Sequence, residues 1–400
     1  MIGIGAEGWD GLPVPARAAL AEAELVIGSD RQLGMVRAHL DAECHPLPSP
    51  LLPELRELLA RHRARRLCVL ASGDPLLYGI GATLVRLLGH EAVHIVPAVS
   101  SVSLACARLG WPIEHTTVLS AVGRPLSRLQ PAIQPGRRLL VLVAEATAAA
   151  AVAGLLCARG FGPSRMVLFE RLGADTEHAV AGTAADWPSD AHDRLAIVAV
   201  DCRPEPTARP LSTVPGLPDD AYDTDGQLTK REVRVLTLAA LAPLPGELLW
   251  DVGAGTGTVA IEWLRSHPDC RAVAIEPRAE RRARIVANAD ALGVPDLVVV
   301  PGSAPAALAG LPPPDAVFVG GAVSVGGVIE GALAALRPGG RIVANAVTLE
   351  AETALSDWHA RLGGELIRIA LSKAAPLGGF TTWRPALPVT QWTYHKENRP

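Results

Sequence analysis

Short apolar runs alternate with amphipathic segments along both halves of the chain. Runs of Val, Ile and Leu of this length are typical of parallel strands buried on both faces, with helices between them. The pattern therefore predicts two α/β domains. The runs lie at residues 25–28, 67–71, 94–96, 139–143, 166–169 and 195–200 in the first half, and at 248–252, 272–275, 297–300, 316–319, 341–344 and 365–370 in the second.

One segment interrupts the alternation. Residues 204–225 contain five prolines and four aspartates, directly after the apolar run 195–200. Prolines remove backbone donors and fix φ, so this composition is typical of a semi-rigid linker. The sequence predicts a first domain over residues 1–203, a linker over 204–225 and a second domain over 226–400.

Charge and composition exclude several functional classes. The chain has 37 basic and 41 acidic residues and only 4% aromatic residues, which argues against a nucleic-acid-binding protein. The first residues lack a basic, apolar signal peptide, and the chain lacks a long uninterrupted apolar stretch. The six cysteines are scattered, so we expect no metal site. We expect a cytoplasmic protein without membrane or nucleic-acid partners.

The second half contains a glycine-rich loop between a strand and a helix. The sequence LLWDVGAGTG at 248–257 ends an apolar run with Asp251 and continues through Gly253, Gly255 and Gly257. Glycines there permit a tight turn and let a ligand lie against the backbone. The next predicted strand ends in Glu276, at the distance where a ribose-binding carboxylate is expected. The sequence therefore predicts a nucleoside-binding site.

A cationic segment precedes this loop. In the sequence QLTKREVR, Thr229 is a plausible helix N-cap, with Glu232 as its capping-box partner. Capping does not explain Lys230, Arg231 and Arg234, which would suit an anionic substrate beside the cofactor cleft. A solvated surface position is the alternative for each of these three residues.

The second half resembles the C-terminal domain of the precorrin-6Y C(5,15)-methyltransferase (decarboxylating) family. The resemblance covers residues 226–393 and rests on LTKREVRVLTLAALAPLPGELLWDVGAGTGTVAIEW, VFVGG, RPGGRIVANAVTLE and GGFTTWRPALPVTQW. It implies a Rossmann-like class I methyltransferase fold that binds S-adenosylmethionine. The residues that it implies as cofactor contacts are Asp251, Gly253, Ala254, Gly255, Thr256, Gly257, Glu276, Ser303 and Ala304.

The first half opens with a different glycine pattern. Gly3, Gly5 and Gly8 satisfy G-x-G-x-x-G, which alone would suggest a dinucleotide-dependent oxidoreductase. Only two residues precede Gly3, too few for a full strand, and prolines follow at positions 13 and 15, so the context argues against that reading. Two more loops, at 71–79 and 97–104, follow apolar runs. Asp74 there is a plausible helix N-cap before Pro75.

These three loops resemble the tetrapyrrole methylase fold of class III methyltransferases. The resemblance covers residues 1–202 and rests on the GIGAEG, SGDPLLYG and PAVSS sequences. It implies a second S-adenosylmethionine site, so each domain would bind its own cofactor. The implied contacts are Gly3, Gly5, Gly73, Asp74, Ser100 and Ser101.

Together the two resemblances imply one substrate that is methylated twice. The expected reaction methylates precorrin-6B at carbon 5 in the first domain and at carbon 15 in the second, with loss of the carbon-12 acetate carboxyl as carbon dioxide, giving precorrin-8. Catalytic candidates are Asp74, Arg231 and Arg234, and Arg124 joins Lys230, Arg231 and Arg234 as a candidate carboxylate ligand. Both families imply a homo-oligomer, a dimer or tetramer. The alternatives are a methyltransferase for a small metabolite or RNA, and the oxidoreductase.

Overall fold

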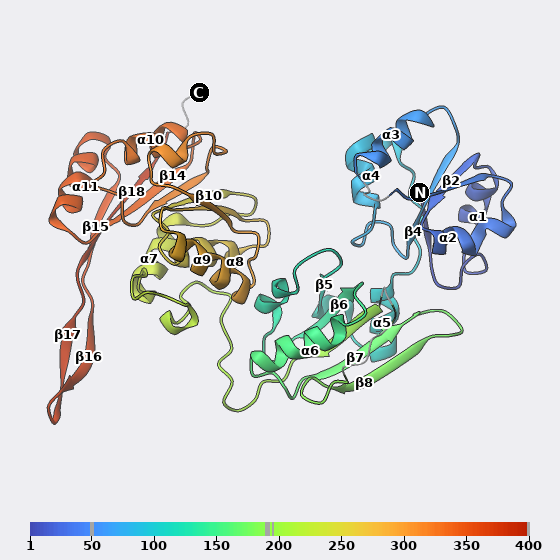
Figure 1. Cartoon of the computed structure of the whole chain (residues 1–400), viewed down its shortest axis with the longest axis horizontal. Coiled ribbons are helices and arrows are strands. Elements are labelled where there is room, and N and C mark those ends of the chain that lie inside the picture. Colours follow the sequence, from blue (N-terminus) through green and yellow to red (C-terminus); the bar gives the residue numbers. More distant parts are fainter. Residues whose placement is uncertain (49–51, 189–192, 194–195, 398–400) are drawn as a thin grey trace. The chain divides into compact units, whose positions relative to one another are not determined.

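The chain folds into two compact units. The computed structural model describes residues 1–48, 52–188, 193 and 196–397 (Figure 1). The first unit comprises Met1–Leu126 and Ala132–Arg209, and the second comprises Ser127–Pro131 and Pro210–Pro400. Within the described residues, no helix has the length and apolar character needed to cross a membrane.

The first unit begins with a four-stranded parallel sheet in the order β1-β4-β2-β3. Strands β2 and β4 match the predicted runs at 25–28 and 67–71. The strands are β1 (Ile2–Ile4), β2 (Leu25–Gly28), β3 (Glu43–Pro46) and β4 (Leu67–Ser72), and the helices are α1 (Val14–Ala21), α2 (Asp30–Val36), α3 (Glu54–Arg61) and α4 (Gly81–Leu88).

The predicted strand at 94–96 did not form. Only Val96 pairs with β1, through a single parallel bridge to Ile2 and two backbone hydrogen bonds, from Gly3 N to Val96 O and from Val96 N to Met1 O. Strand β1 is three residues long, and the next residue on the other side is Pro97, which has no N–H to continue the ladder. The pairing therefore ends after one residue.

The rest of the first unit is a five-stranded sheet in the order β5-β6-β9-β7-β8. Only β5 and β6 are parallel, so the expectation of parallel strands is wrong here. Residues 171–177, which join β7 to β8, are too few for a parallel crossover. Residue 195, which begins one predicted strand, lies outside the described residues. The elements are β5 (Thr116–Ser120), β6 (Arg138–Val143), β7 (Arg165–Glu170), β8 (His178–Thr183), β9 (Ala196–Asp201), α5 (Ser101–Leu109) and α6 (Ala148–Ala158).

The second unit contains a seven-stranded sheet in the order β12-β11-β10-β13-β14-β18-β15. The first five strands are parallel, and β18 is antiparallel to both neighbours. The chain order reverses between β10 and β13, which makes the carboxyl end of β10 the topological switch point where ligands bind in such sheets. The strands are β10 (Leu248–Val252), β11 (Arg271–Glu276), β12 (Val298–Pro301), β13 (Ala316–Val319), β14 (Arg341–Ala346), β15 (Glu365–Ile369) and β18 (Val389–His395).

Helices and two apolar clusters complete the second unit. One cluster contains Trp263 and Phe318, and the other contains Trp250 and Trp392. Both are built from side chains of the central strands, so each face of the sheet is covered, as the continuous apolar runs predicted. The helices are α7 (Arg231–Leu241), α8 (Thr258–Ser266), α9 (Ala279–Ala291), α10 (Val328–Ala335) and α11 (Leu349–Leu362).

A two-stranded hairpin extends away from this sheet (Figure 1). It consists of β16 (Ser372–Leu377) and β17 (Phe380–Pro385), which among the described strands pair only with each other. Phe380 is 83% exposed and Trp383 is 72% exposed.

Much of the predicted linker is part of the second unit's core. Leu217 and Tyr222 are buried in the cluster that contains Trp263. The carbonyl oxygen of Ser212 accepts a hydrogen bond of 3.0 Å from Arg265 on α8. The prediction of a linker over 204–225 is therefore wrong from residue 210 onward. Prolines exclude regular helix or strand, but they do not prevent an irregular segment from packing.

Candidate active sites

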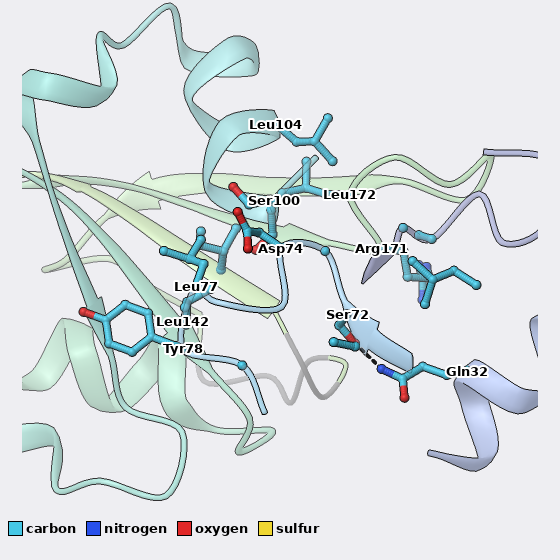
Figure 2. Close-up of a pocket in the computed structure, with 18 of the residues that line it drawn as sticks. Gln32, Ser72, Asp74, Leu77, Tyr78, Ser100, Leu104, Leu142, Arg171 and Leu172 are labelled. Carbon is cyan, nitrogen blue, oxygen red and sulfur yellow. Dashed lines mark hydrogen bonds between the residues drawn. The ribbon is translucent and has the colours of Figure 1, made fainter. Parts of the chain in front are cut away.

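The three loops predicted in the first unit line one pocket of about 890 Å³. Gly5 follows β1, Gly73 and Asp74 follow β4, and Ser100 and Ser101 follow the bridge at Val96. These segments are parallel neighbours, so their carboxyl ends meet at one edge of the sheet. Figure 2 shows Asp74 beside Ser100 in this pocket. The three loops therefore converge on one pocket.

Gly3 has a different role from the other predicted contacts. It is not among the residues that line the pocket. A Cβ atom added to Gly3 would lie 2.2 Å from the carbonyl oxygen of Gly73 and 2.6 Å from the backbone nitrogen of Ala98. Gly3 is thus required for the close approach of the three loops to each other, although it does not line the pocket itself.

Asp74 does not cap a helix. Its Oδ1 accepts a hydrogen bond of 2.8 Å from the backbone nitrogen of Leu76, which closes a local turn, and α4 begins only at Gly81. The predicted helix start at Pro75 is therefore wrong. Ser100 is the N-cap of α5, where its Oγ accepts from the backbone nitrogen of Ser103 at 3.1 Å. Asp74 remains half-buried in the pocket lining.

Two pocket residues have backbones in the left-handed region. Tyr78 and Arg171 both have a φ of 51°, which is costly for side chains of this size and is typical of functional sites. The Tyr78 hydroxyl donates to the carbonyl oxygen of Val118 at 3.1 Å. The guanidinium of Arg124 lies 5.2 Å from the centre of the Tyr78 ring. Arg124 is exposed, and its contact with Tyr78 places it next to a residue of the pocket wall.

Sequence reasoning missed two arginines of this pocket, Arg31 and Arg171. Arg171 donates to the carbonyl oxygen of Thr176 at 2.9 Å and forms an ion pair with Asp193. Both arginines follow the carboxyl end of a strand, β2 or β7, by a few residues. Their position after an apolar run was a signal that could have identified them.

In the second unit, the glycine loop follows β10 at the switch point. Gly253, Gly255 and Gly257 all have φ between 61° and 79°. Oε2 of Glu276, at the end of β11, accepts from the backbone nitrogen of Gly255 at 2.9 Å. Glu276 is therefore held against the loop, at the place that the sequence predicted. Oδ2 of Asp251 accepts from the backbone nitrogen of Ala260 on α8 at 3.0 Å.

Two buried oxygens of this loop lack a hydrogen-bond partner in the described structure: Oδ1 of Asp251 and Oγ1 of Thr256. Burial raises the pKa of Asp251 to about 7, and the charge of Glu276 adds to this effect. Unsatisfied buried polar atoms are rare in proteins, so these two oxygens are candidates for contacts with a polar ligand. A nucleoside with hydroxyl and amino groups fits this set of acceptors.

Ser303 and Ala304 lie at the same edge of the sheet. Pro301, the last residue of β12, pairs with Glu276 of β11, and Ser303 follows two residues later. Ser303 is exposed and Ala304 is half-buried. The structure thus brings both residues close along the sheet edge to the carboxylate predicted to bind ribose.

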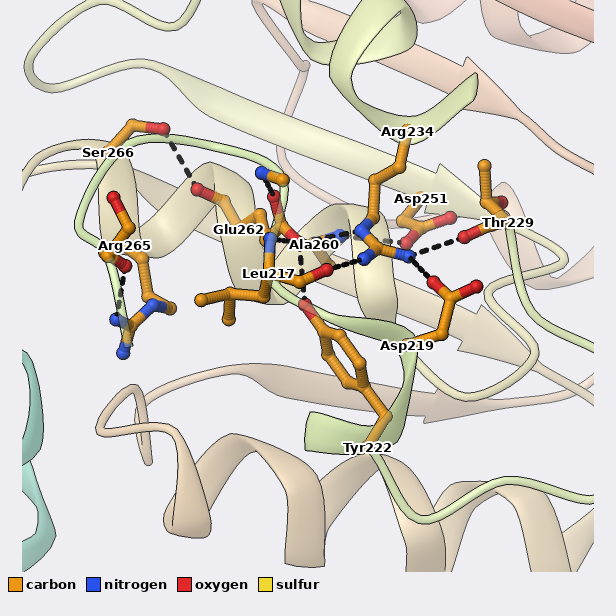
Figure 3. A network of polar contacts seen from close by, with 12 residues as sticks. Leu217, Asp219, Tyr222, Thr229, Arg234, Asp251, Ala260, Glu262, Arg265 and Ser266 are labelled. Atoms are coloured by element: carbon orange, nitrogen blue, oxygen red, sulfur yellow. Dashed lines mark hydrogen bonds and ion pairs between the residues drawn. The ribbon is translucent and has the colours of Figure 1, made fainter. Parts of the chain in front are cut away.

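Arg234 is not available to a substrate, contrary to our prediction. Its side chain is fully buried, and four of its five N–H donors are bound (Figure 3). Nε donates to Oε1 of Glu262 at 2.6 Å, and Nη1 donates to Oδ1 of Asp219 at 3.1 Å. The other two donate to the carbonyl oxygens of Thr229 and Leu217. Arg234 therefore joins the segment before α7 to helix α8.

Lys230 and Arg231 are exposed at the start of α7, in keeping with a substrate or a surface role. The predicted capping box is absent from this helix: its N-cap is Lys230, and Glu232 forms an ion pair of 2.8 Å with Lys373 of β16. A Cβ atom on Gly255 would lie 3.7 Å from the carbonyl oxygen of Gln227. The segment that leads to Lys230 thus borders the glycine loop.

Comparison with known proteins supports both halves of this description. Residues 1–188 match the family model of tetrapyrrole (corrin/porphyrin) methylases, and residues 220–396 match the model of a precorrin methyltransferase domain. The chain thus has a class III methyltransferase fold followed by a class I methyltransferase fold. A precorrin-6Y C(5,15)-methyltransferase [decarboxylating] from Sinorhizobium sp is 46% identical over 99% of this chain and 96% of its own length.

Two shorter relatives from Salmonella typhimurium each match under half of the chain. A cobalt-precorrin-7 C(5)-methyltransferase is 33% identical over 48% of this chain and 95% of its own length. A cobalt-precorrin-6B C(15)-methyltransferase (decarboxylating) is 32% identical over 42% of this chain and 90% of its own length. In that organism the two named methylations belong to separate proteins.

Proposed function

Because this chain belongs to the family of precorrin-6Y C(5,15)-methyltransferases (decarboxylating), we infer that it methylates a precorrin at carbons 5 and 15 and releases carbon dioxide. As the resemblance implies, the substrate is precorrin-6B, the carbon dioxide comes from the acetate on carbon 12, and the product is precorrin-8. This reaction belongs to cobalamin biosynthesis and uses S-adenosylmethionine as methyl donor.

We propose that each unit has its own cofactor site and its own reaction. The observation that carries this proposal is that two unrelated sets of loops each gather at the carboxyl edge of their own parallel sheet. The first unit would methylate carbon 5, and the second would methylate carbon 15 and decarboxylate. The two half-length relatives, each named for one of these methylations, support this division.

The residues of each site suit the cofactor in different ways. S-adenosylmethionine supplies an electrophilic methyl group on a sulfonium, so the protein needs mainly to align the acceptor carbon with it. In the first unit, Gly5, Gly73, Ser100 and Ser101 would hold the cofactor in the pocket. In the second unit, the set would be the glycine loop with Ala254, and Asp251, Thr256, Glu276, Ser303 and Ala304.

The substrate carries several carboxylates, so cationic side chains near each site would orient it. Arg124 beside Tyr78 and the exposed pair Lys230 and Arg231 are the candidates that remain after Arg234 is excluded. Asp74 lies among the lining residues with its Oδ1 engaged in a turn, and we propose that it orients the substrate in the first unit.

A turnover assay on the full chain tests this function. Precorrin-6B and ¹³C-methyl S-adenosylmethionine are incubated with the protein, and mass spectrometry counts the methyl groups added and the carbon dioxide lost. We expect two methyl groups and one carbon dioxide per tetrapyrrole. A tetrapyrrole returned unchanged, alongside methylation of tRNA or a small metabolite, would move the protein to a different substrate class.

We also propose that the chain assembles into a homo-oligomer, a dimer or tetramer, through the β16–β17 hairpin. Its exposed Phe380 and Trp383 support this, because packing against a second copy would remove these large apolar side chains from water. Light scattering coupled to gel filtration measures the mass. Phe380→Asp should shift the protein to monomer, whereas Leu244→Asp, at an exposed position outside the hairpin, should not.

A further inference from the structure

One group of polar side chains in the N-terminal pocket, outside the proposed cofactor contacts, consists of Arg31, Gln32 and Ser72. Arg31 and Gln32 belong to the first turn of α2, and Ser72 is the last residue of β4, directly before Gly73. Figure 2 shows the hydrogen bond between Gln32 and Ser72. These side chains therefore extend the pocket on the side of strands β2 and β4.

Their hydrogen bonds leave one donor of Ser72 free. Oγ of Ser72 accepts from Nη2 of Arg31 at 2.8 Å and from Nε2 of Gln32 at 3.0 Å. A hydroxyl has two acceptor positions and one proton to donate. Both acceptor positions are occupied, and none of the described residues accepts the proton. Ser72 is exposed in the pocket lining, so this proton is available to a ligand in place of water.

Gln32 holds this arrangement in place. Its side chain is 5% exposed, and its Oε1 accepts from the backbone nitrogen of Ser29 at 2.8 Å, as part of a capping box for α2. The amide is therefore oriented, and its nitrogen must face Ser72. A donor that is fixed before the ligand arrives costs less entropy to use than a mobile one.

Arg31 carries a positive charge without an acidic partner among the described residues. Its single hydrogen bond there goes to Ser72, and Arg31 is exposed in the lining of the pocket. The other arginine of the pocket, Arg171, is already paired with Asp193. An anion placed against Arg31 would therefore meet an exposed guanidinium whose remaining N–H donors are not used by any described residue.

We propose that Arg31 and Ser72 bind a side-chain carboxylate of the tetrapyrrole in the first unit, with Gln32 as the residue that positions Ser72. The guanidinium N–H groups of Arg31 and the hydroxyl of Ser72 are donors of the kind that a carboxylate accepts from. The inference rests on the proposed function and adds a specificity-determining site to it. The methionine carboxylate of the cofactor has the same chemistry, so the test must separate these two sources.

The test compares Arg31→Gln with Arg37→Gln in the full chain. Arg37 is an exposed arginine that follows α2 and does not line the pocket. Precorrin-6B is varied with ¹³C-methyl S-adenosylmethionine, and NMR reads the methyl group at carbon 5 separately from that at carbon 15. For Arg31→Gln we expect KM for the tetrapyrrole at the carbon-5 step to rise roughly 10- to 100-fold, as for loss of a charged hydrogen bond.

The carbon-15 methylation is the internal control and should stay within about twofold of the unsubstituted chain when normalised to enzyme concentration, because Arg31 belongs to the other unit. Arg31→Lys keeps the charge but loses the planar guanidinium, so its KM should lie between those of the unsubstituted chain and Arg31→Gln. Ser72→Ala removes only the neutral donor and should raise KM roughly threefold to tenfold. The melting temperature of each variant checks that the first unit is folded.

Three outcomes would overturn the proposal. The first is an unchanged KM for the tetrapyrrole in Arg31→Gln. The second is weaker binding of the cofactor at one of two sites, measured by calorimetry on the full Arg31→Gln chain. The latter result would assign the carboxylate to the cofactor. If Arg31→Gln fails to fold, an unchanged KM in Ser72→Ala overturns the proposal. A parent chain that leaves precorrin-6B unmethylated would instead refute the proposed function itself.

Discussion

The two units differ in how the arginine near each candidate site is bonded. In the second unit Arg234 is fully buried and spends four N–H donors on its own fold, including an ion pair with Glu262. In the first unit Arg31 makes one hydrogen bond among the described residues, to Ser72, and faces a pocket. An arginine near a glycine loop is therefore informative only when the fold around it leaves its donors free.

The carboxylates of the two sites differ as well. Asp74 is half-buried and its Oδ1 closes a turn, whereas Asp251 is 1% exposed and has one oxygen without a partner in the described structure. The first site is thus an open pocket with ready-made donors. The second is a loop with buried oxygens that no described residue binds.

The strongest test of this contrast is Gly255→Arg. Gly255 has a φ of 61°, and a side chain there would project into the glycine loop beside Gln227. We expect carbon-15 methylation to fall at least 1,000-fold, on the order of 4 kcal/mol or more of transition-state binding, while carbon-5 methylation persists. Decarboxylation should be lost with it, as read by carbon dioxide release.

Gly246→Arg is the matched control for Gly255→Arg. Gly246 also has a positive φ, of 84°, and is exposed in the turn before β10. The Gly246→Arg substitution should lower the free energy of unfolding by about 1 kcal/mol and leave both methylations intact. Decarboxylation retained in Gly255→Arg would remove that step from the second unit or show that it runs without cofactor.

A second, smaller effect is expected for Arg234→Leu. Removing one partner of a buried ion pair leaves Glu262 uncompensated, which costs about 3–5 kcal/mol of the second unit's stability. Denaturant unfolding measures this loss, and Arg231→Leu, at an exposed neighbour, should change it by less than about 0.5 kcal/mol. Adding Glu262→Leu to Arg234→Leu should recover part of the loss.

The third effect concerns pH. The pKa of Asp251 is about 7 in the folded protein and about 4 in an unfolded chain, so the folded state binds the extra proton between these values. Stability of the second unit should therefore decrease as pH rises from about 4 to about 7, by up to roughly 4 kcal/mol. Asp251→Asn should flatten this slope, and Asp290→Asn, at an exposed position of α9, should retain it. Parallel curves for both variants would contradict the assignment.

The sequence predicted the parts of the fold that depend on local periodicity and chain order. The runs at 248–252 and 316–319 are the strands β10 and β13, and the glycine loop lies between β10 and α8 as expected. Convergence of the first unit's loops also followed, because parallel neighbours bring their carboxyl ends together.

What the sequence missed depends on contacts between distant residues. Thr229 and Glu232 have the spacing of a capping box, but Lys373, far along the chain, holds Glu232 in an ion pair. Glu262 makes Arg234 structural, although nothing local to either residue reveals the pair. Short connections, such as residues 171–177, decide strand direction more strongly than apolar composition does.

The burial of Leu217 and Tyr222 has a consequence for how such enzymes divide and fuse. A gene break placed where the conspicuous prolines end, at residue 226, would strip the second enzyme of two core side chains and of the carbonyl oxygen of Leu217 that Arg234 binds. A break before Pro210 keeps all of these together. The smallest portion that can be inherited as an independent second enzyme therefore begins at about Pro210 and includes the prolines at 210, 215 and 218.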